Sequence, residues 1–239
     1  AMTRSVRDAM LLHEVLAART VVRGGGDLRA CRLAVPRQLM QDGMDSTVAR
    51  AFERTLDRLS AAGARIETVD LPELAQAPQL QARCTFAGAE AAAWHRDWVA
   101  PHARLYDPRV LLRLQKGATM LAHDYVTLVA ERQAWIARME HAIGPFDALL
   151  SPTVPVVAPP LAEVAPGAER DEAFFALNGL LLRNPSAINL LDGCALSLPC
   201  QQAGELPVGL MVWQGAMRDD GVLHAGLLIE AALAAGGRA

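Results

Sequence analysis

Hydrophobic positions repeat with two different periods along the first seventy residues, and the change of period marks the elements. Apolar side chains share one helical face over 5–17, after a cap at Ser5, and again over 45–63. Short apolar or alternating runs at 31–36 and 65–71 predict strands on either side of the second helix. Strand, helix and strand joined by short turns favour a parallel crossover, so we predict an α/β protein.

The rest of the chain is mostly helical in pattern until a last group of strands. Residues 73–142 read as helices interrupted near three prolines, and the clearest helix covers 124–142. The five prolines between 152 and 170 predict a fixed loop without regular structure. Further buried strands are expected at 148–151, 195–198 and 208–212, and further helices at 174–182 and 220–234.

The domain organisation predicted from these patterns is a single domain in three consecutive segments. Residues 1–72 form an α/β segment, 73–145 a helical segment, and 146–239 the closing strands and helix. The glycines of 24–27 predict a linker, because the Gly-Lys-Ser/Thr of a phosphate-binding loop does not follow them.

Composition narrows the classes of function. A net charge of −3 without a basic stripe argues against nucleic-acid binding. Hydrophobic residues make up 52% of the chain and the mean hydropathy is +0.17, but no apolar run approaches the ~18 residues of a membrane span. The four cysteines lack a CxxC spacing and predict reduced, mostly buried thiols. With no targeting segment visible, we expect a cytoplasmic protein.

Motifs for catalysis are scarce. The chain has no Gly-x-Ser-x-Gly turn around a nucleophilic serine, and no histidine pair with a glutamate that would suit a metal. We therefore predict no metal and no cofactor. Lys116, the single lysine, reads as a solvated side chain rather than a general base.

Four blocks of sequence carry a family resemblance. They are Ala1-Met-Thr-Arg-Ser-Val-Arg-Asp-Ala9, Phe146-Asp-Ala-Leu-Leu-Ser-Pro-Thr-Val-Pro155, Asn189-Leu-Leu-Asp-Gly-Cys-Ala-Leu-Ser-Leu-Pro-Cys200 and Leu206-Pro-Val-Gly-Leu210. In this order they resemble the carboxyl-terminal portion of the amidase signature family, similar to glutamyl-tRNA amidotransferase A subunit-like amidases. The resemblance implies the corresponding part of that fold, a mixed β-sheet flanked by helices on both faces.

The resemblance also implies a mechanism whose catalytic groups lie upstream of this chain. Family members hydrolyse a carboxamide to a carboxylate and ammonia or an amine, through a lysine, a bridging cis-serine and a nucleophilic serine that forms an acyl-enzyme. This chain holds no Ser-Ser pair and no matching lysine, so we predict no catalytic residue in it and no activity alone. The alternatives are a non-catalytic substrate-binding or scaffold half that acts with a partner chain, and a stand-alone α/β ligand-binding protein.

Four residues are candidates for a substrate-binding wall. The resemblance places the Pro-Thr-x-Pro loop, with Thr153, and the segment before Asn189, with Arg183 and Asn184, near the pocket. Arg113 aligns with an arginine that holds a substrate carboxylate in the A subunits of tRNA amidotransferases, and this task suits a guanidinium fork. A plain surface or interhelical role for Arg113 stays open.

Departures from the family pattern point to a small-molecule amide as substrate. Glu205 stands where a glycine is usual, Met211 replaces a frequent glutamine, and Asp192-Gly193-Cys194 replaces a Gly-Leu-Pro run. These changes favour an amidase over a tRNA-dependent amidotransferase. The expected macromolecular partner is the missing amino-terminal catalytic half or another copy of the chain, with no nucleic acid and no membrane. Without that half, open strand edges and apolar surface should face water.

Overall fold

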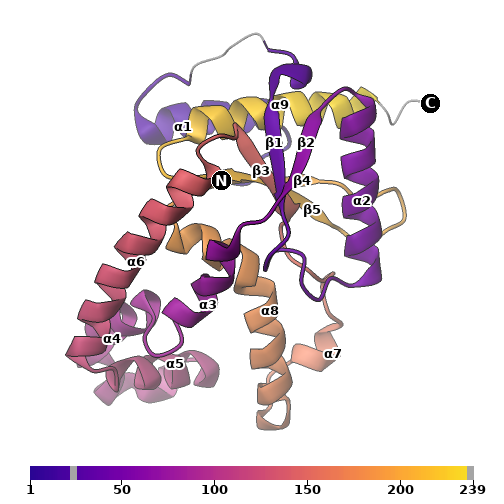
Figure 1. Cartoon of the computed structure of the whole chain (residues 1–239). Helices are drawn as coiled ribbons and strands as arrows, with labels where there is room; N and C mark the ends of the chain where they lie inside the picture. Colours follow the sequence, from indigo (N-terminus) through magenta and orange to yellow (C-terminus); the bar gives the residue numbers. More distant parts are fainter. Residues whose placement is uncertain (22–25, 236–239) are drawn as a thin grey trace. The chain divides into compact units, whose positions relative to one another are not determined.

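The computed structural model of this protein describes residues 1–21 and 26–235, which form two compact units (Figure 1). One unit contains residues 1–74 and 139–239, and the other contains residues 75–138. The predicted single domain, with divisions near residues 72 and 145, stays a prediction. Of the glycine-rich linker predicted at 24–27, residues 24 and 25 lie outside the described residues.

The first unit is built around a five-stranded mixed sheet. Its strands are β1 (Arg32–Pro36), β2 (Arg65–Val69), β3 (Ala148–Pro152), β4 (Cys194–Pro199) and β5 (Gly209–Gln214). They lie in the order β2-β1-β3-β5-β4. β1 runs parallel to β2 and β3, whereas β5 is antiparallel to both β3 and β4. The predicted parallel crossover and the predicted mixed sheet are both confirmed.

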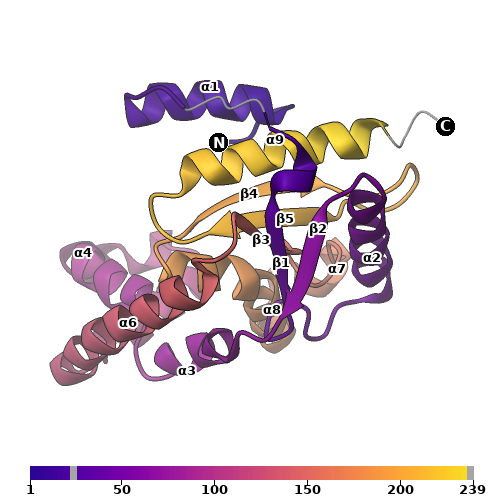
Figure 2. The ribbon, with the colours of Figure 1, turned by 45° about the horizontal axis from the view of Figure 1, so that its top comes forward.

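Helices cover both faces of this sheet, as predicted. The helices of the unit are α1 (Val6–Ala17), α2 (Ser46–Ala61), α7 (Leu161–Val164), α8 (Asp171–Leu190) and α9 (Asp219–Ala235), with 3₁₀ turns at Leu28–Ala30, Pro72–Gln76 and Ala168–Arg170. Figures 1 and 2 show α1 and α9 on one side of the strands and α8 on the other. α9 contacts β3, β4 and β5, and both α1 and α2 pack against α9.

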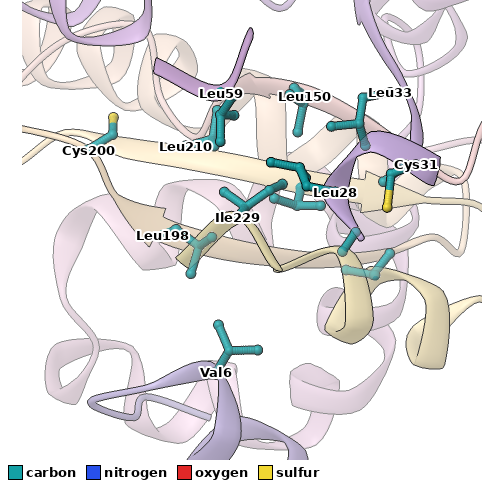
Figure 3. Close-up of a cluster of buried hydrophobic side chains, with 14 of the residues drawn as sticks. Val6, Leu28, Cys31, Leu33, Leu59, Leu150, Leu198, Cys200, Leu210 and Ile229 are labelled. Atoms are coloured by element: carbon teal, nitrogen blue, oxygen red, sulfur yellow. The ribbon is translucent and has the colours of Figure 1, made fainter. Parts of the chain in front are cut away.

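Alternate strand positions supply the core beneath α9. Leu33, Leu150, Leu210 and Leu198, from four different strands, are buried with Ile229 of α9 in one cluster (Figure 3). Because side chains alternate between the faces of a strand, each of these strands sends the intervening residue to the opposite face. Burying such leucines contributes on the order of 2 kcal/mol each.

The opposite face of β3 and β5 is also buried. Leu149 and Trp213 are paired in register, and both are inaccessible to solvent. α8 lies on this side and buries Asn184, Ala187 and Ile188. β3 and β5 are therefore buried on both faces, which explains their continuous apolar runs in the sequence.

The second unit is helical, as the sequence predicts. It contains α3 (Ala77–Leu80), α4 (Phe86–His102), a 3₁₀ turn (Ala103–Leu105), α5 (Pro108–Ala118) and most of α6 (Ala122–Ile143). The three prolines mark helix ends: Pro78 and Pro108 lie in first turns, and Pro101 is the penultimate residue of α4. α6 agrees with the helix predicted over 124–142.

One local prediction was confirmed but too short, and one was wrong. The helix expected at 174–182 extends from Asp171 to Leu190 and passes through Pro185, because burial of its last turns outweighs the hydrogen bond that a proline removes. The region expected to lack regular structure contains α7 and a 3₁₀ turn, which fit between its prolines.

Candidate functional site

The Pro-Thr-x-Pro loop is held by the start of α2. The Asp45 amide donates to the carbonyl of Pro155 over 3.0 Å, and the Val157 amide donates to Asp45 Oδ2 over 2.7 Å. The other oxygen, Oδ1, accepts from the amides of Thr47 and Val48, each at 2.8 Å, and so caps α2. One carboxylate therefore ties the loop that follows β3 to the first turn of a helix from elsewhere in the chain.

Thr153, the first residue after β3, forms a hydroxyl pair with a serine on β4. Thr153 Oγ1 and Ser197 Oγ lie 2.6 Å apart, although β5 runs between their strands. Gly209 of β5 makes this possible, because a Cβ there would lie 2.5 Å from Ser197 Oγ and 2.6 Å from Thr153 Oγ1. The Thr153 amide also donates to the carbonyl of Gly209. The pair is accessible to solvent.

Asn184 of α8 is fully buried and fixes the end of β3. Its Nδ2 donates to the carbonyls of Met40 and Pro152, over 2.8 and 2.9 Å, while its Oδ1 accepts from Nε of Arg183 over 3.1 Å. These three hydrogen bonds occupy both amide hydrogens and the oxygen. Asn184 therefore positions the residues around it.

Arg183 is half-buried, and Asn184 orients its guanidinium group. Burial lowers the pKa of Arg183, and the nearby carboxylate of Asp42 partly offsets this effect. Its Nη2 nitrogen is buried without a hydrogen-bond partner among the described residues. An unpaired buried donor costs free energy, so a hydrogen bond from this nitrogen to an added acceptor would be favourable.

The predicted site residues separate into two groups. The contacts of Asn184 bring Arg183 and Asn184 to Pro152, the residue before Thr153, within the first unit. Arg113 lies on the exposed side of α5 in the second unit. Lys116 is also exposed on α5, in keeping with a solvated lysine.

Two residues of this site, Ser197 and Gly209, were missed as functional candidates from sequence. Their meeting with Thr153 depends on the register of three strands, which sequence alone does not give. A signal was nevertheless present, since Gly209 interrupts the apolar run from Val208 to Val212. An isolated glycine in a strand indicates close approach of another group.

The described residues contain no group of three or more His, Cys, Asp or Glu side chains that could hold a metal ion. None of the helices in the described part of the chain is long and apolar enough to cross a membrane. All four cysteines are free thiols, and three of them are buried.

Comparison with known proteins identifies the family. A sequence model of the family named Amidase matches residues 1–223, almost the whole chain. This chain belongs to the amidase family. The predicted resemblance is thereby confirmed, and a solved structure titled as that of an amidase agrees with the chain at a TM-score of 0.78 and 32% identity, covering 96% of this chain and 51% of that one.

Relatives in the amidase family differ in what their names say they do. A 2-amino-5-chloromuconic acid deaminase of Comamonas testosteroni is 29% identical over 211 residues, with 87% of this chain and 45% of the relative covered. The A subunit of the glutamyl-tRNA(Gln) amidotransferase of Streptomyces coelicolor is 28% identical, with 96% of this chain and 53% of the relative covered. The chain thus spans about half the length of the curated relatives it matches.

We predict that Asp45 matters for more than its helix cap. Asp45→Ala removes the acceptor for three amides and should lower the free energy of unfolding by roughly 2–3 kcal/mol. Asp45→Asn keeps the cap but replaces one acceptor oxygen by a donor, so it should cost only about 1 kcal/mol. Urea denaturation checks both values, and an Asp45→Asn variant as stable as the unmodified protein would contradict the separate role of Oδ2.

We predict that Gly209→Ala disrupts the hydroxyl pair. The added methyl group would crowd both oxygens, and the substitution should cost about 1–3 kcal/mol of stability. Removing one oxygen first, by Ser197→Ala, should reduce that cost. A double-mutant cycle compares the cost of Gly209→Ala with and without Ser197→Ala. Strictly additive effects would show that the side chain at residue 209 does not interact with the hydroxyl pair.

Asn184→Ala should be among the most damaging single changes in the first unit. It leaves the carbonyls of Met40 and Pro152 without their donor in a buried place, at a cost of roughly 2–4 kcal/mol. Asn184→Asp preserves the shape but loses both N–H donors, so it should be no better tolerated. Thermal unfolding followed by circular dichroism checks this, and a near-native Asp variant would argue against the two donated bonds.

Proposed function

We propose that residues 1–239 form the substrate-binding part of an amide hydrolase. The reaction is hydrolysis of a carboxamide to a carboxylate and ammonia or an amine. In this proposal the lysine, bridging serine and nucleophilic serine belong to polypeptide outside these residues, and they form and hydrolyse the acyl-enzyme. The substrate is a small-molecule amide.

The observation that carries the proposal is the family match over residues 1–223 in a chain that lacks the family's Ser-Ser pair and lysine. Membership implies amide chemistry, and the absence of these residues implies that this part contributes binding and positioning. The wall of the site in this proposal is formed by Thr153, Arg183 and Asn184, with Ser197 as the partner of Thr153.

The hydroxyl pair suits the polar end of a carboxamide. When two hydroxyls share one hydrogen bond, one hydrogen and several lone pairs remain for a third group. A carboxamide both accepts through its oxygen and donates through its nitrogen, so it can use both capacities. A carboxylate only accepts hydrogen bonds, so it would leave the lone pairs of the two hydroxyl oxygens unused.

Arginine suits a carboxylate carried elsewhere on the substrate. Arg183 is oriented by Asn184, and a guanidinium group can form two parallel hydrogen bonds to one carboxylate. Arg113 is a second candidate for the same role by its family alignment. The proposal assigns substrate carboxylates to these residues and assigns no catalytic step to them.

An alternative is a non-catalytic scaffold that assembles with a partner and binds no substrate. The accessible hydroxyl pair argues for the binding function, because a scaffold has no need of Gly209 to keep two hydroxyls in contact. The two alternatives differ in whether substitution at Thr153 changes substrate affinity.

The test uses a chimera in which this chain replaces the matched portion of the amidase of known structure. We expect the chimera to release ammonia from a screen of aliphatic and aryl primary amides, and the isolated chain to release none. An isolated chain that hydrolyses amides would contradict the proposed division of labour. A folded chimera with no activity on any amide would contradict the proposed function.

In an active chimera, Thr153→Val should raise KM for the best primary amide roughly threefold to tenfold, as expected for one lost hydrogen bond. Thr153→Ser keeps the hydroxyl and should stay near the unmodified KM. Steady-state kinetics separates KM from kcat. Equal KM values for the Val and Ser variants would show that Thr153 does not bind substrate and would favour the scaffold.

A further inference from the structure

α2 holds the two chain segments that carry the hydroxyl pair. Its first turn binds the loop after Thr153 through Asp45. Further along the same helix, Arg54 binds the hairpin loop 200–208, which joins β4 to β5. Because Ser197 lies on β4, one helix contacts the segments from which both hydroxyls come.

A single carboxylate makes the second of these connections. Glu205 Oε2 accepts from Nη2 of Arg54 over 2.6 Å and from the amide of Gln202 over 2.8 Å. The Glu205 amide in turn donates to the carbonyl of Gln202, and Gly204 between them has a φ of +85°, which glycine adopts readily. The side chains of Arg54 and Glu205 are only 30% and 25% exposed, so solvent screens their contact less than that of a fully exposed pair.

The contact between Glu205 and Arg54 is an ion pair at neutral pH. The Gln202 amide and, next, the Arg54 guanidinium hold the pKa of the Glu205 carboxyl below its usual range, although partial burial opposes them. Arg50, one turn earlier on α2, acts in the same direction. Hydrogen bonds between charged groups are stronger than those between neutral groups, so this contact suits the task of fixing a loop.

The base of the hairpin is also fixed on α2. Cys200 follows β4 directly and is buried. Burial raises the pKa of its thiol, and a hydrogen bond with the Thr55 side chain partly offsets this effect. Thr55 is itself buried and donates to the carbonyl of Ala51. The Cys200 amide donates to the carbonyl of Val208 over 2.9 Å and closes the hairpin.

The position of Ser197 depends on these contacts, because its own backbone does not bond to β5. The hydrogen bond that closes the hairpin sets the phase of the ladder, along which hydrogen-bonded and non-hydrogen-bonded pairs alternate. Leu198 and Leu196 therefore bond to β5, whereas Ser197, opposite Met211, occupies a non-hydrogen-bonded position. Its hydroxyl is held near Thr153 by the bonded pairs on either side and by the hairpin that follows.

We propose that Glu205 is a positioning residue for the hydroxyl pair. Through Arg54 it fixes the β4–β5 hairpin, and with it Ser197, on the helix that also holds the loop after Thr153. It acts through Arg54 rather than through contact with substrate, and it takes no part in a catalytic step. Its effect on substrate affinity rests on the proposed function, whereas its effect on the geometry of the pair does not.

The first test follows the pair in residues 1–239 without substrate. Glu205→Ala removes the acceptor of both hydrogen bonds, and NMR measures hydrogen exchange at the Thr153 amide, which donates to the carbonyl of Gly209. Exchange at the Leu149 amide, in the buried middle of the same strand, corrects for any loss of global stability. We expect the ratio of the two exchange rates to rise at least about threefold.

Three further variants separate the ion pair from other effects. Asp220→Ala removes a comparable contact, 2.8 Å from Arg19 with side chains 39% and 29% exposed, at the start of α9. Arg54→Lys keeps a positive charge for Glu205, whereas Arg54→Met keeps the apolar stem without the charge. The Asp220→Ala and Arg54→Lys variants should change the exchange ratio less than about 1.5-fold, and Arg54→Met should behave as Glu205→Ala does.

The second test uses the active chimera and its best primary amide. Glu205→Ala should raise KM about threefold and leave kcat within about twofold of the unmodified value. Added to Thr153→Val, the same substitution should raise KM no further, because a positioning residue loses its effect when the group that it positions is gone. A general structural role would instead add to the effect of Thr153→Val.

The outcomes separate the two proposals. Unchanged exchange at Thr153 in Glu205→Ala or in Arg54→Met overturns the positioning role, whether or not the chimera is active. An equal rise in the Asp220→Ala control overturns it as well, and so do additive effects on KM. If exchange changes as expected but the folded chimera hydrolyses no amide, Glu205 positions the pair and the proposed function is wrong. Circular dichroism confirms that every variant is folded.

Discussion

The antiparallel pairing of β3 with β5 is the interaction on which the rest of the first unit depends. β3 receives β1 in parallel on one side and β5 in antiparallel on the other, so it is where the two parts of the sheet join. Both strands are buried on both faces, and their apolar burial anchors α9 on one side and α8 on the other. The candidate site lies at the end of this strand pair, because Thr153 follows β3 directly and Gly209 is the first residue of β5.

The same pairing explains why polar groups can persist here. Asn184 is fully buried, yet both of its amide hydrogens and its oxygen are used. Asp45 uses both oxygens, for the helix cap and for the loop after β3. Fully satisfied polar groups cost little and fix geometry, whereas half-satisfied ones destabilise. Arg183 Nη2 is one of four buried side-chain polar atoms without a hydrogen-bond partner among the described residues, and Arg183 belongs to the proposed substrate wall.

Much of the fold could be predicted from sequence because its signals are local. The cap at Asp45, the alternation of the strands and the long periodicity of α6 each lie within one element. The length of α8 could not be predicted, since tertiary burial carries that helix through Pro185. The hydroxyl pair also could not be predicted from sequence, because Thr153 and Ser197 are 44 residues apart in the chain and meet only across a third strand. Family resemblance identified Thr153, Arg183 and Asn184 as candidates, but the structure is needed to distinguish an accessible hydroxyl from a buried amide that positions its neighbours.

The central claim is that β4 forms an edge of the sheet and pairs only with β5 among the described residues. Hydrogen–deuterium exchange, measured residue by residue on the isolated chain by NMR, tests it directly. The account predicts fast exchange for the amides of Ala195 and Ser197 and slow exchange for those of Leu196 and Leu198, which bond to β5. If all four amides exchange equally slowly, the edge is already paired in the isolated chain, and the claim is wrong.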